Sequence, residues 1–175
     1  MSTTLKNETA TAYNAQPTDT KPAQPVKIDL PAVGNMRLTM TGYTMPKTRI
    51  ANRPDLEDYC KKLIQHEPFE SMRAIFVNIQ CQVVGDVEIC SGDLSECSAY
   101  IRKIMTYAIL CNASCMFLTH NHPGGTCSPS MEDVKSTEQI ISAFRPFGIC
   151  VLDHCIVTPQ GACYSMASNG DVNFN

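Results

Sequence analysis

The sequence predicts a single α/β domain in which a mixed β-sheet is flanked by helices. The chain has 175 residues, which is long enough for one domain with a substantial buried core. Its hydrophobic pattern changes between helical and strand periods in the order helix, strand, strand, helix, strand, helix, strand, strand. It contains no run of about 18 apolar residues of the kind that spans a bilayer. These observations favour a globular domain that does not cross a membrane.

The N-terminal residues differ in composition from the rest of the chain. Residues 1–26 are rich in Thr, Ala, Pro, Gln and Asn and hold few large aliphatic side chains, so they cannot bury enough apolar surface to fold. Apolar residues return over 27–48 without a clear period, which indicates a linker or an arm. We therefore assign the domain to residues 49–168 and expect a short C-terminal tail over 169–175.

The first half of the domain is predicted to contain two helices and two strands. A helix over 54–65 is favoured because acidic residues open it and lysines close it, as the helix dipole prefers. Apolar, strand-forming residues predict strands over 73–79 and 82–90. A second helix is expected over about 98–111.

The second half is predicted to contain three strands and one helix. The run over 115–119 is almost continuously apolar, which predicts a buried strand that delivers His120 to its carboxyl end. In α/β sheets this end is where sites form. A helix over 131–144 ends ahead of a proline, and strands over 149–157 and 162–166 complete the sheet.

The ten cysteines are numerous for a chain of this size. Because the sequence opens without the features of a secretory signal peptide, we expect a cytoplasmic protein with reduced cysteines. Several lie inside apolar runs and are predicted to be mostly buried small hydrophobic residues, namely Cys111, Cys115, Cys150 and Cys155. A second candidate metal cluster surrounds His154, but the chain has no CxxC pair and the spacing matches no zinc finger. That disfavoured cluster would comprise Cys150, His154, Cys155 and Cys163.

Charge is divided unevenly along the chain. Residues 1–65 carry nine Lys+Arg and six Asp+Glu, a net charge of +3, whereas residues 66–175 carry five and eleven, a net charge of −6. A nucleic-acid-binding domain usually presents a basic patch or stripe, which this acidic part does not have. Any contact with nucleic acid would therefore use the N-terminal part, and the charge of the domain does not support one.

The segment around His120 carries the pattern His-x-His-x7-Ser-x2-Asp, formed by His120, His122, Ser130 and Asp133. Side chains two residues apart on an extended segment point the same way, so both imidazoles can face one metal ion. The Pro-Gly-Gly that follows turns the chain back, and Asp133 can supply a third ligand from the start of the next helix. Two nitrogens and one carboxylate oxygen leave a fourth tetrahedral position open, as in catalytic zinc sites. The pattern therefore indicates a hydrolytic metal site.

Each of these residues also has a purely structural interpretation. Ser130 and Asp133 have the spacing of a capping box, with Asp in place of the preferred Glu or Gln. The two histidines could simply be solvated at a strand end. The chain has only four histidines, and the placement of two of them just ahead of that cap favours a metal. Both interpretations of Asp133 remain open at this point.

These residues resemble the signature of the JAMM (MPN+) metalloprotease superfamily, and more closely that of its RadC branch, the so-called DNA repair protein RadC. The likeness covers about 49–167 and is carried by Thr119 to Pro123, Pro129-Ser130, Glu132-Asp133, Thr137, the run 152–156 and Tyr164-Ser165. It implies a single MPN/JAB-like domain whose mixed sheet is mostly antiparallel, in a layout like that of cytidine deaminase. The helix-hairpin-helix region of full-length members has no counterpart here, so we expect the catalytic domain alone.

The resemblance implies a role for each site residue. Zinc would be held by His120, His122 and Asp133. The family uses a glutamate near the first strand as general base, and Glu70 is the first choice because the family pattern runs from it without a gap. Glu88 is the second choice. The Ser130 hydroxyl, together with the metal, would stabilise the oxyanion of the reaction.

The reaction implied by the resemblance is cleavage of a peptide or isopeptide amide in a protein or peptide substrate. The main alternative is a non-catalytic DNA-repair accessory or protein-interaction module on the same fold. A zinc nucleobase deaminase is disfavoured because it needs His-x-Glu with Pro-Cys-x-x-Cys, and this chain has neither. His154 also matches the family, and we expect it to pack or to form hydrogen bonds rather than to bind the metal.

Overall fold

The computed structural model describes residues 48–91 and 97–174. The predicted disordered tail over 1–26 and nearly all of the predicted arm over 27–48 lie outside the described residues. The described elements are α1 (Arg53–Ile64), β1 (Ser71–Val77), β2 (Val83–Ser91), α2 (Cys97–Leu110), β3 (Cys115–Asn121), α3 (Met131–Phe144), η1 (Arg145–Phe147), β4 (Cys150–Val157), β5 (Cys163–Ser165) and α4 (Met166–Asn169). None of the helices in these residues has the length and apolar character needed to span a membrane.

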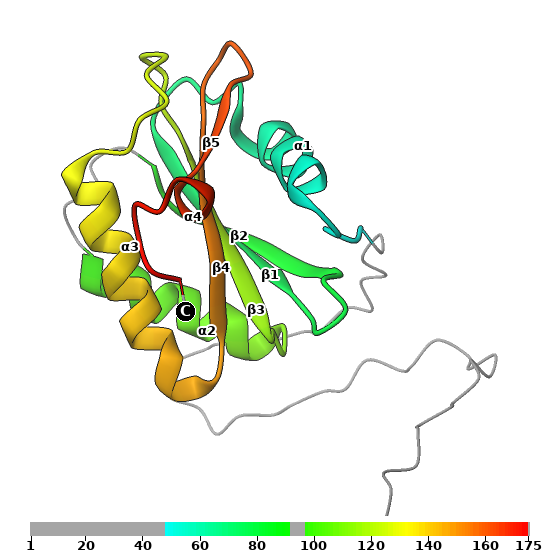
Figure 1. The fold of residues 1–175 in the computed structure, drawn as a ribbon. Helices are drawn as coiled ribbons and strands as arrows, with labels where there is room; N and C mark the ends of the chain where they lie inside the picture. The colour runs from blue at the N-terminus through cyan, green and yellow to red at the C-terminus, as the bar shows by residue number, and fades with distance from the viewer. Residues whose placement is uncertain (1–47, 92–96, 175) are drawn as a thin grey trace, which may run out of the picture. The chain divides into compact units, whose positions relative to one another are not determined.

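The five strands form one mixed sheet in the order β2-β1-β3-β4-β5 (Figure 1). The only parallel neighbours within this sheet are β3 and β4, and the other three pairings are antiparallel. This confirms the predicted α/β fold with a mixed, mostly antiparallel sheet flanked by helices. The parallel pair is central, and α3 makes the crossover between its two strands.

Helix α1 forms where its sequence predicts. The Asn52 side chain caps it by accepting a hydrogen bond of 3.0 Å from the backbone N–H of Asp55, and a proline lies in its first turn. Leu56, Cys60 and Ile64 recur at intervals of four residues and are buried, so one stripe of the helix packs against the sheet.

Apolar residues are buried on both faces of the sheet, in two separate clusters. One cluster contains the buried residues of α2 and α3 and the other those of α1, so α1 covers one face and α2 and α3 cover the other (Figure 1). Side chains of β3 alternate between them, with Met116 and Leu118 in the first cluster and Phe117 in the second. A strand that is buried on both faces has a nearly continuous apolar sequence, which explains the pattern over 115–119. The same alternation puts His120 on the α3 face.

The prediction that the cysteines are mostly buried was wrong. The nine cysteines whose side chains the structure describes are all free, but only Cys60 and Cys155 among them are buried, and Cys150 is exposed. Cys115 and Cys150 are the first residues of β3 and β4 and lie opposite each other in the strand register, at the rim of the sheet rather than in its middle. An apolar run in the sequence therefore predicted the strand correctly but not the burial of its first residue.

The chain forms a short helix, α4, after its last strand, and the sequence did not predict this helix. Strand β5 ends at Ser165, whose hydroxyl caps the short helix α4 by accepting a hydrogen bond of 3.0 Å from the N–H of Ser168. Val172 lies in the cluster on the α3 face and is 8% exposed. Val172 and Phe174 therefore pack on the domain, within the segment 169–175 that the sequence predicted to be a tail.

Candidate metal centre

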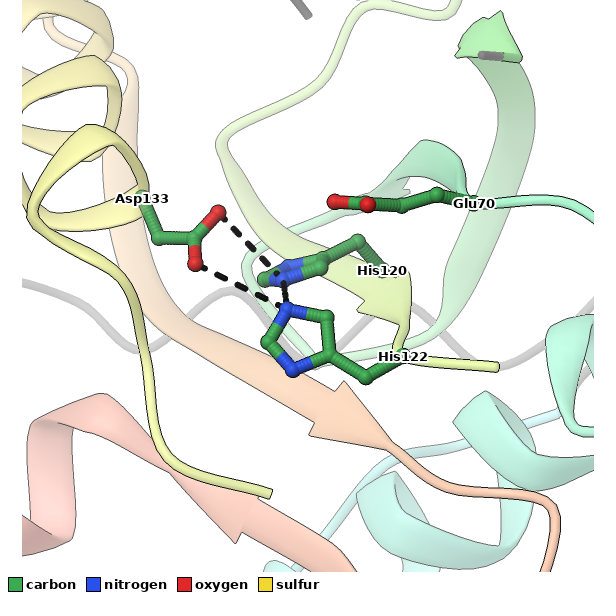
Figure 2. Close-up of side chains that lie close together, drawn as sticks. All are labelled: Glu70, His120, His122 and Asp133. Atoms are coloured by element: carbon green, nitrogen blue, oxygen red, sulfur yellow. Dashed lines mark hydrogen bonds and ion pairs between the residues drawn. The ribbon is translucent and has the colours of Figure 1, made fainter. Parts of the chain in front are cut away.

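Four side chains that can bind a metal converge at the carboxyl end of β3 (Figure 2). They are Glu70, His120, His122 and Asp133, and they offer one ligand atom each, all within 4.8 Å of one another. Two of these residues, His120 and Asp133, are buried, and the other two are partly exposed. The site is therefore anchored in the core and open to solvent on one side.

The fold explains how residues far apart in the sequence meet here. Met72 of β1 lies opposite His120 of β3 in an antiparallel pair, so residues just before Met72 lie beside residues just after His120. This places Glu70, directly ahead of β1, next to His122, directly after β3. Asp133 enters from the first turn of α3 on the same face of the sheet as His120.

The two imidazoles present their Nε2 atoms to each other and to the carboxylate. The Nε2 atoms of His120 and His122 are 2.8 Å apart. The Asp133 carboxylate lies 3.4 Å from Nε2 of His120 through Oδ1 and 3.7 Å from Nε2 of His122 through Oδ2. Two imidazole nitrogens and one carboxylate oxygen around a common point are the donors of catalytic zinc sites.

His122 has the tautomer that a metal ligand needs. Its Nδ1–H donates a hydrogen bond of 2.7 Å to the backbone carbonyl of Thr126, which can only accept. The lone pair of the ring is therefore on Nε2 whenever the imidazole is neutral, facing His120 and Asp133. A backbone carbonyl that holds the other ring nitrogen is the usual partner of a metal-binding histidine. The residues present thus fit a bound metal ion.

Asp133 serves both as a helix cap and as a member of the cluster. Its Oδ2 accepts hydrogen bonds of 2.7 Å from the backbone N–H and from the hydroxyl of Ser130, and the Ser130 Oγ accepts one of 3.1 Å from the Asp133 N–H. The capping box is therefore complete, and it aims Oδ1 at His120. The two interpretations that the sequence left open are compatible, because each uses different lone pairs of one carboxylate.

Electrostatics in the cluster favour an ionised carboxylate. Burial opposes ionisation of Asp133, but hydrogen bonds with His120, His122 and Ser130 outweigh it and hold the pKa of the carboxyl well below its usual range. In turn the hydrogen bond with Asp133 raises the pKa of His122, against the effect of burial. A negative group at this point attracts either a proton on His122 or a metal cation.

Asn121, between the two histidines, holds the segment that carries Glu70. Its Oδ1 accepts a hydrogen bond of 2.8 Å from the N–H of Ser71, and its Nδ2 donates to the carbonyls of Glu67 and Phe69 at 3.1 and 3.0 Å. Asn121 is 1% exposed, so its own polar atoms are shielded from water. Sequence reasoning missed this residue, although strand alternation could have indicated that it points away from His120 and toward the other face.

Glu88, the second candidate for general base, lies outside the cluster. It is on β2, where it lies opposite Arg73 of β1 and forms an ion pair of 3.7 Å with that side chain. Glu70 is the glutamate that the fold brings to the histidines.

The disfavoured cysteine cluster around His154 is not a metal group in the part of the chain that the structure describes, where the four residues above form the one group that could hold an ion. His154 is buried, and its Nε2 forms a hydrogen bond of 2.8 Å with Nδ1 of His120. This confirms the prediction of a hydrogen-bonding role. Burial holds the pKa of His154 well below its usual range, so its imidazole is neutral.

The fold and the clustered residues define the class of protein as a JAB/MPN domain. Residues 50–171 match the family model of the RadC-like JAB domain. Because that match covers more than half of the chain, the protein belongs to the RadC family of the JAB/MPN superfamily.

Relatives with similar sequences share the name UPF0758 protein. The one from Haemophilus influenzae (strain PittEE) is 34% identical over 143 residues, which are 81% of this chain and 64% of the relative. The one from Paracidovorax citrulli (strain AAC00-1) is 32% identical over 145 residues, 82% of this chain and 61% of the relative. The one from Ectopseudomonas mendocina (strain ymp) is 35% identical over 115 residues, 66% of this chain and 51% of the relative. The chain therefore spans between half and two thirds of the length of these relatives.

Proposed function

We propose that this protein is a zinc-dependent metallohydrolase that cleaves a peptide or isopeptide amide bond. The observation that carries the proposal is the convergence of two histidines, an aspartate and a glutamate within 4.8 Å at one end of β3. A site that served only to hold the fold together would have no need of three metal-binding side chains beside a partly exposed glutamate. The ten cysteines of the chain suit a reducing compartment, so we place the reaction in the cytoplasm.

Three residues would hold the metal: His120 and His122 through Nε2, and Asp133 through a carboxylate oxygen. When bound, zinc supplies a Lewis acid that lowers the pKa of water from 15.7 toward about 7. Burial of His120 and Asp133 keeps these ligands fixed. The hydrogen bond to the Thr126 carbonyl orients the His122 ring, and the one from Ser130 orients the Asp133 carboxylate.

Glu70 would be the general base of the reaction. Its carboxylate takes a proton from the attacking water as the new bond to the amide carbon forms, and it then delivers that proton to the leaving nitrogen. Its partial exposure suits this role, since substrate and water must both reach the carboxylate. Asn121 keeps the backbone beside Glu70 in place, so the base does not depend on a loose loop.

Ser130 would donate a hydrogen bond to the developing oxyanion. Its hydroxyl hydrogen is directed at Asp133 Oδ2, so this role requires the hydroxyl to exchange that carboxylate for the substrate oxygen. Its backbone N–H would remain on the carboxylate during the exchange.

The experiment compares Glu70→Gln with Glu88→Gln in cleavage of a proteome-derived peptide library and of lysine-linked isopeptides, followed by mass spectrometry. Wild type and Glu88→Gln should both cleave and both hold zinc, whereas Glu70→Gln should hold zinc but cleave nothing. Full activity of Glu70→Gln would remove it from the scheme. Zinc binding without any cleavage by wild type would favour a non-catalytic accessory or interaction module on the same fold.

A further inference from the structure

A chain of buried hydrogen bonds joins His120 to the backbone of Asp133 on the side away from the metal-binding atoms. The Thr137 Oγ1 lies 2.6 Å from the carbonyl oxygen of Asp133 and 2.6 Å from Nδ1 of His154. The Nε2 of His154 lies 2.8 Å from Nδ1 of His120. Thr137 is 0% exposed and both histidines are 1% exposed, so water does not compete for these bonds.

The direction of every bond in this chain follows from its first member. A carbonyl oxygen can only accept, so the single hydroxyl hydrogen of Thr137 is donated to Asp133. The hydroxyl oxygen must then accept from Nδ1–H of His154. A neutral imidazole has one N–H, so Nε2 of His154 carries a lone pair and accepts from Nδ1–H of His120.

The consequence falls on His120 at the other end. With its proton on Nδ1, the neutral ring has its lone pair on Nε2, which faces His122 at 2.8 Å and Asp133 at 3.4 Å. Without these hydrogen bonds, the proton of His120 could be on either ring nitrogen, and a proton on Nε2 would block metal binding. The carbonyl of Thr126 fixes His122 in the same tautomer by a direct bond.

We propose that Thr137 and His154 are positioning residues that fix His120 in the Nδ1–H tautomer and so keep its Nε2 free for the metal. This inference rests on the proposed metal-dependent function. Thr137 lies four residues after Asp133 on α3, so one residue of the ligand-bearing helix sets the proton position on the ligand-bearing strand through His154 of β4. Partners of this kind typically change metal affinity by roughly 10- to 100-fold when removed.

The test measures zinc affinity by competition with a chelator for wild type, Thr137→Val and Thr137→Ser. Valine keeps the shape of threonine and removes the hydroxyl, and serine keeps the hydroxyl. Thr137→Val should bind zinc roughly 10- to 100-fold more weakly, and Thr137→Ser within about threefold of wild type. The matched control is Thr106→Val, because the Thr106 hydroxyl makes the same kind of bond, 2.9 Å to the carbonyl of Arg102 on α2, without a histidine attached. Equal affinity of Thr137→Val and wild type would overturn the inference.

A second measurement does not depend on metal or on the stability of a variant. Long-range proton–nitrogen correlation spectra of the metal-free wild-type protein report which ring nitrogen of each histidine carries hydrogen. His120 and His154 should both show hydrogen on Nδ1 and none on Nε2. Hydrogen on Nε2 of His154 would refute the chain of bonds. If wild type has these tautomers but takes up no zinc, the proposed function fails while the hydrogen-bond chain itself stands.

Discussion

Asn121→Ala should destabilise the domain strongly, because this buried side chain makes three hydrogen bonds to one short segment. They join Oδ1 to the N–H of Ser71 at 2.8 Å and Nδ2 to the carbonyls of Glu67 and Phe69 at 3.1 and 3.0 Å. A typical buried hydrogen bond contributes about 1 kcal/mol, and the loss of three predicts about 3 kcal/mol less free energy of unfolding.

The matched control is Asn78→Ala in the β1–β2 turn. Asn78 also makes three hydrogen bonds, with its Oδ1 accepting from the N–H groups of Gln80 and Gln82 and its Nδ2 donating to the Gln82 side chain. Its side chain is only half-buried, so water can replace the lost partners, and we expect a loss of about 1 kcal/mol or less.

Equilibrium urea denaturation, followed by circular dichroism, measures both variants. Hydrogen exchange adds a local reading, since the Ser71 amide should exchange faster in Asn121→Ala than in wild type. A loss of less than about 1 kcal/mol in Asn121→Ala, or one no larger than in Asn78→Ala, would show that these bonds do not stabilise the domain.

Three further changes give sharp expectations. Asp133→Asn should lose zinc in metal analysis, because the amide is neutral and cannot replace a carboxylate between two histidines; retained zinc would contradict the ligand set. Ser130→Ala should lower the free energy of unfolding by about 0.5–2 kcal/mol in urea titrations, because the helix cap is lost. An unchanged free energy of unfolding would contradict a stabilising role of this cap. Gly85→Ala should lower the free energy of unfolding by about 1–3 kcal/mol, because the Cβ of the new alanine would lie 2.7 Å from Cys111 Sγ. Adding Cys111→Ala should recover much of that loss, and a purely additive double variant would disprove the clash.

The sequence predicted the order of the strands and helices because most of them carry a clear local signal. Helix α3 begins and ends where its capping box and the following proline indicate, over Met131–Phe144. The end of the chain was harder to predict. Ser165 is the last residue of β5 and caps α4, and its hydroxyl donates a hydrogen bond of 2.6 Å to the buried carboxylate of Asp153. That contact spans twelve positions and leaves no local pattern.

The candidate site divides in the same way. His120, His122 and Asp133 lie within one continuous motif, so their spacing alone indicated a metal. Glu70 lies fifty residues from His120 and was chosen by family resemblance, because nothing near it in the sequence marks a base.

For two of the residues that orient this site, the hydrogen-bond partners could not be predicted from the sequence. Asn121 and Thr137 look like ordinary polar residues of a strand and a helix. Their partners are set by the antiparallel pairing of β1 with β3 and by the parallel pairing of β3 with β4. Only the packed sheet brings these groups within hydrogen-bonding distance.

The proposed function requires His120, His122 and Asp133 to hold a zinc ion. The most direct test is the metal content of the purified protein, compared with His122→Ala and with His66→Ala as a matched control on an exposed histidine outside the cluster. Wild type and His66→Ala should contain about one zinc per chain, as a single three-ligand site implies, and His122→Ala should contain much less. Equal zinc in wild type and His122→Ala would contradict the site.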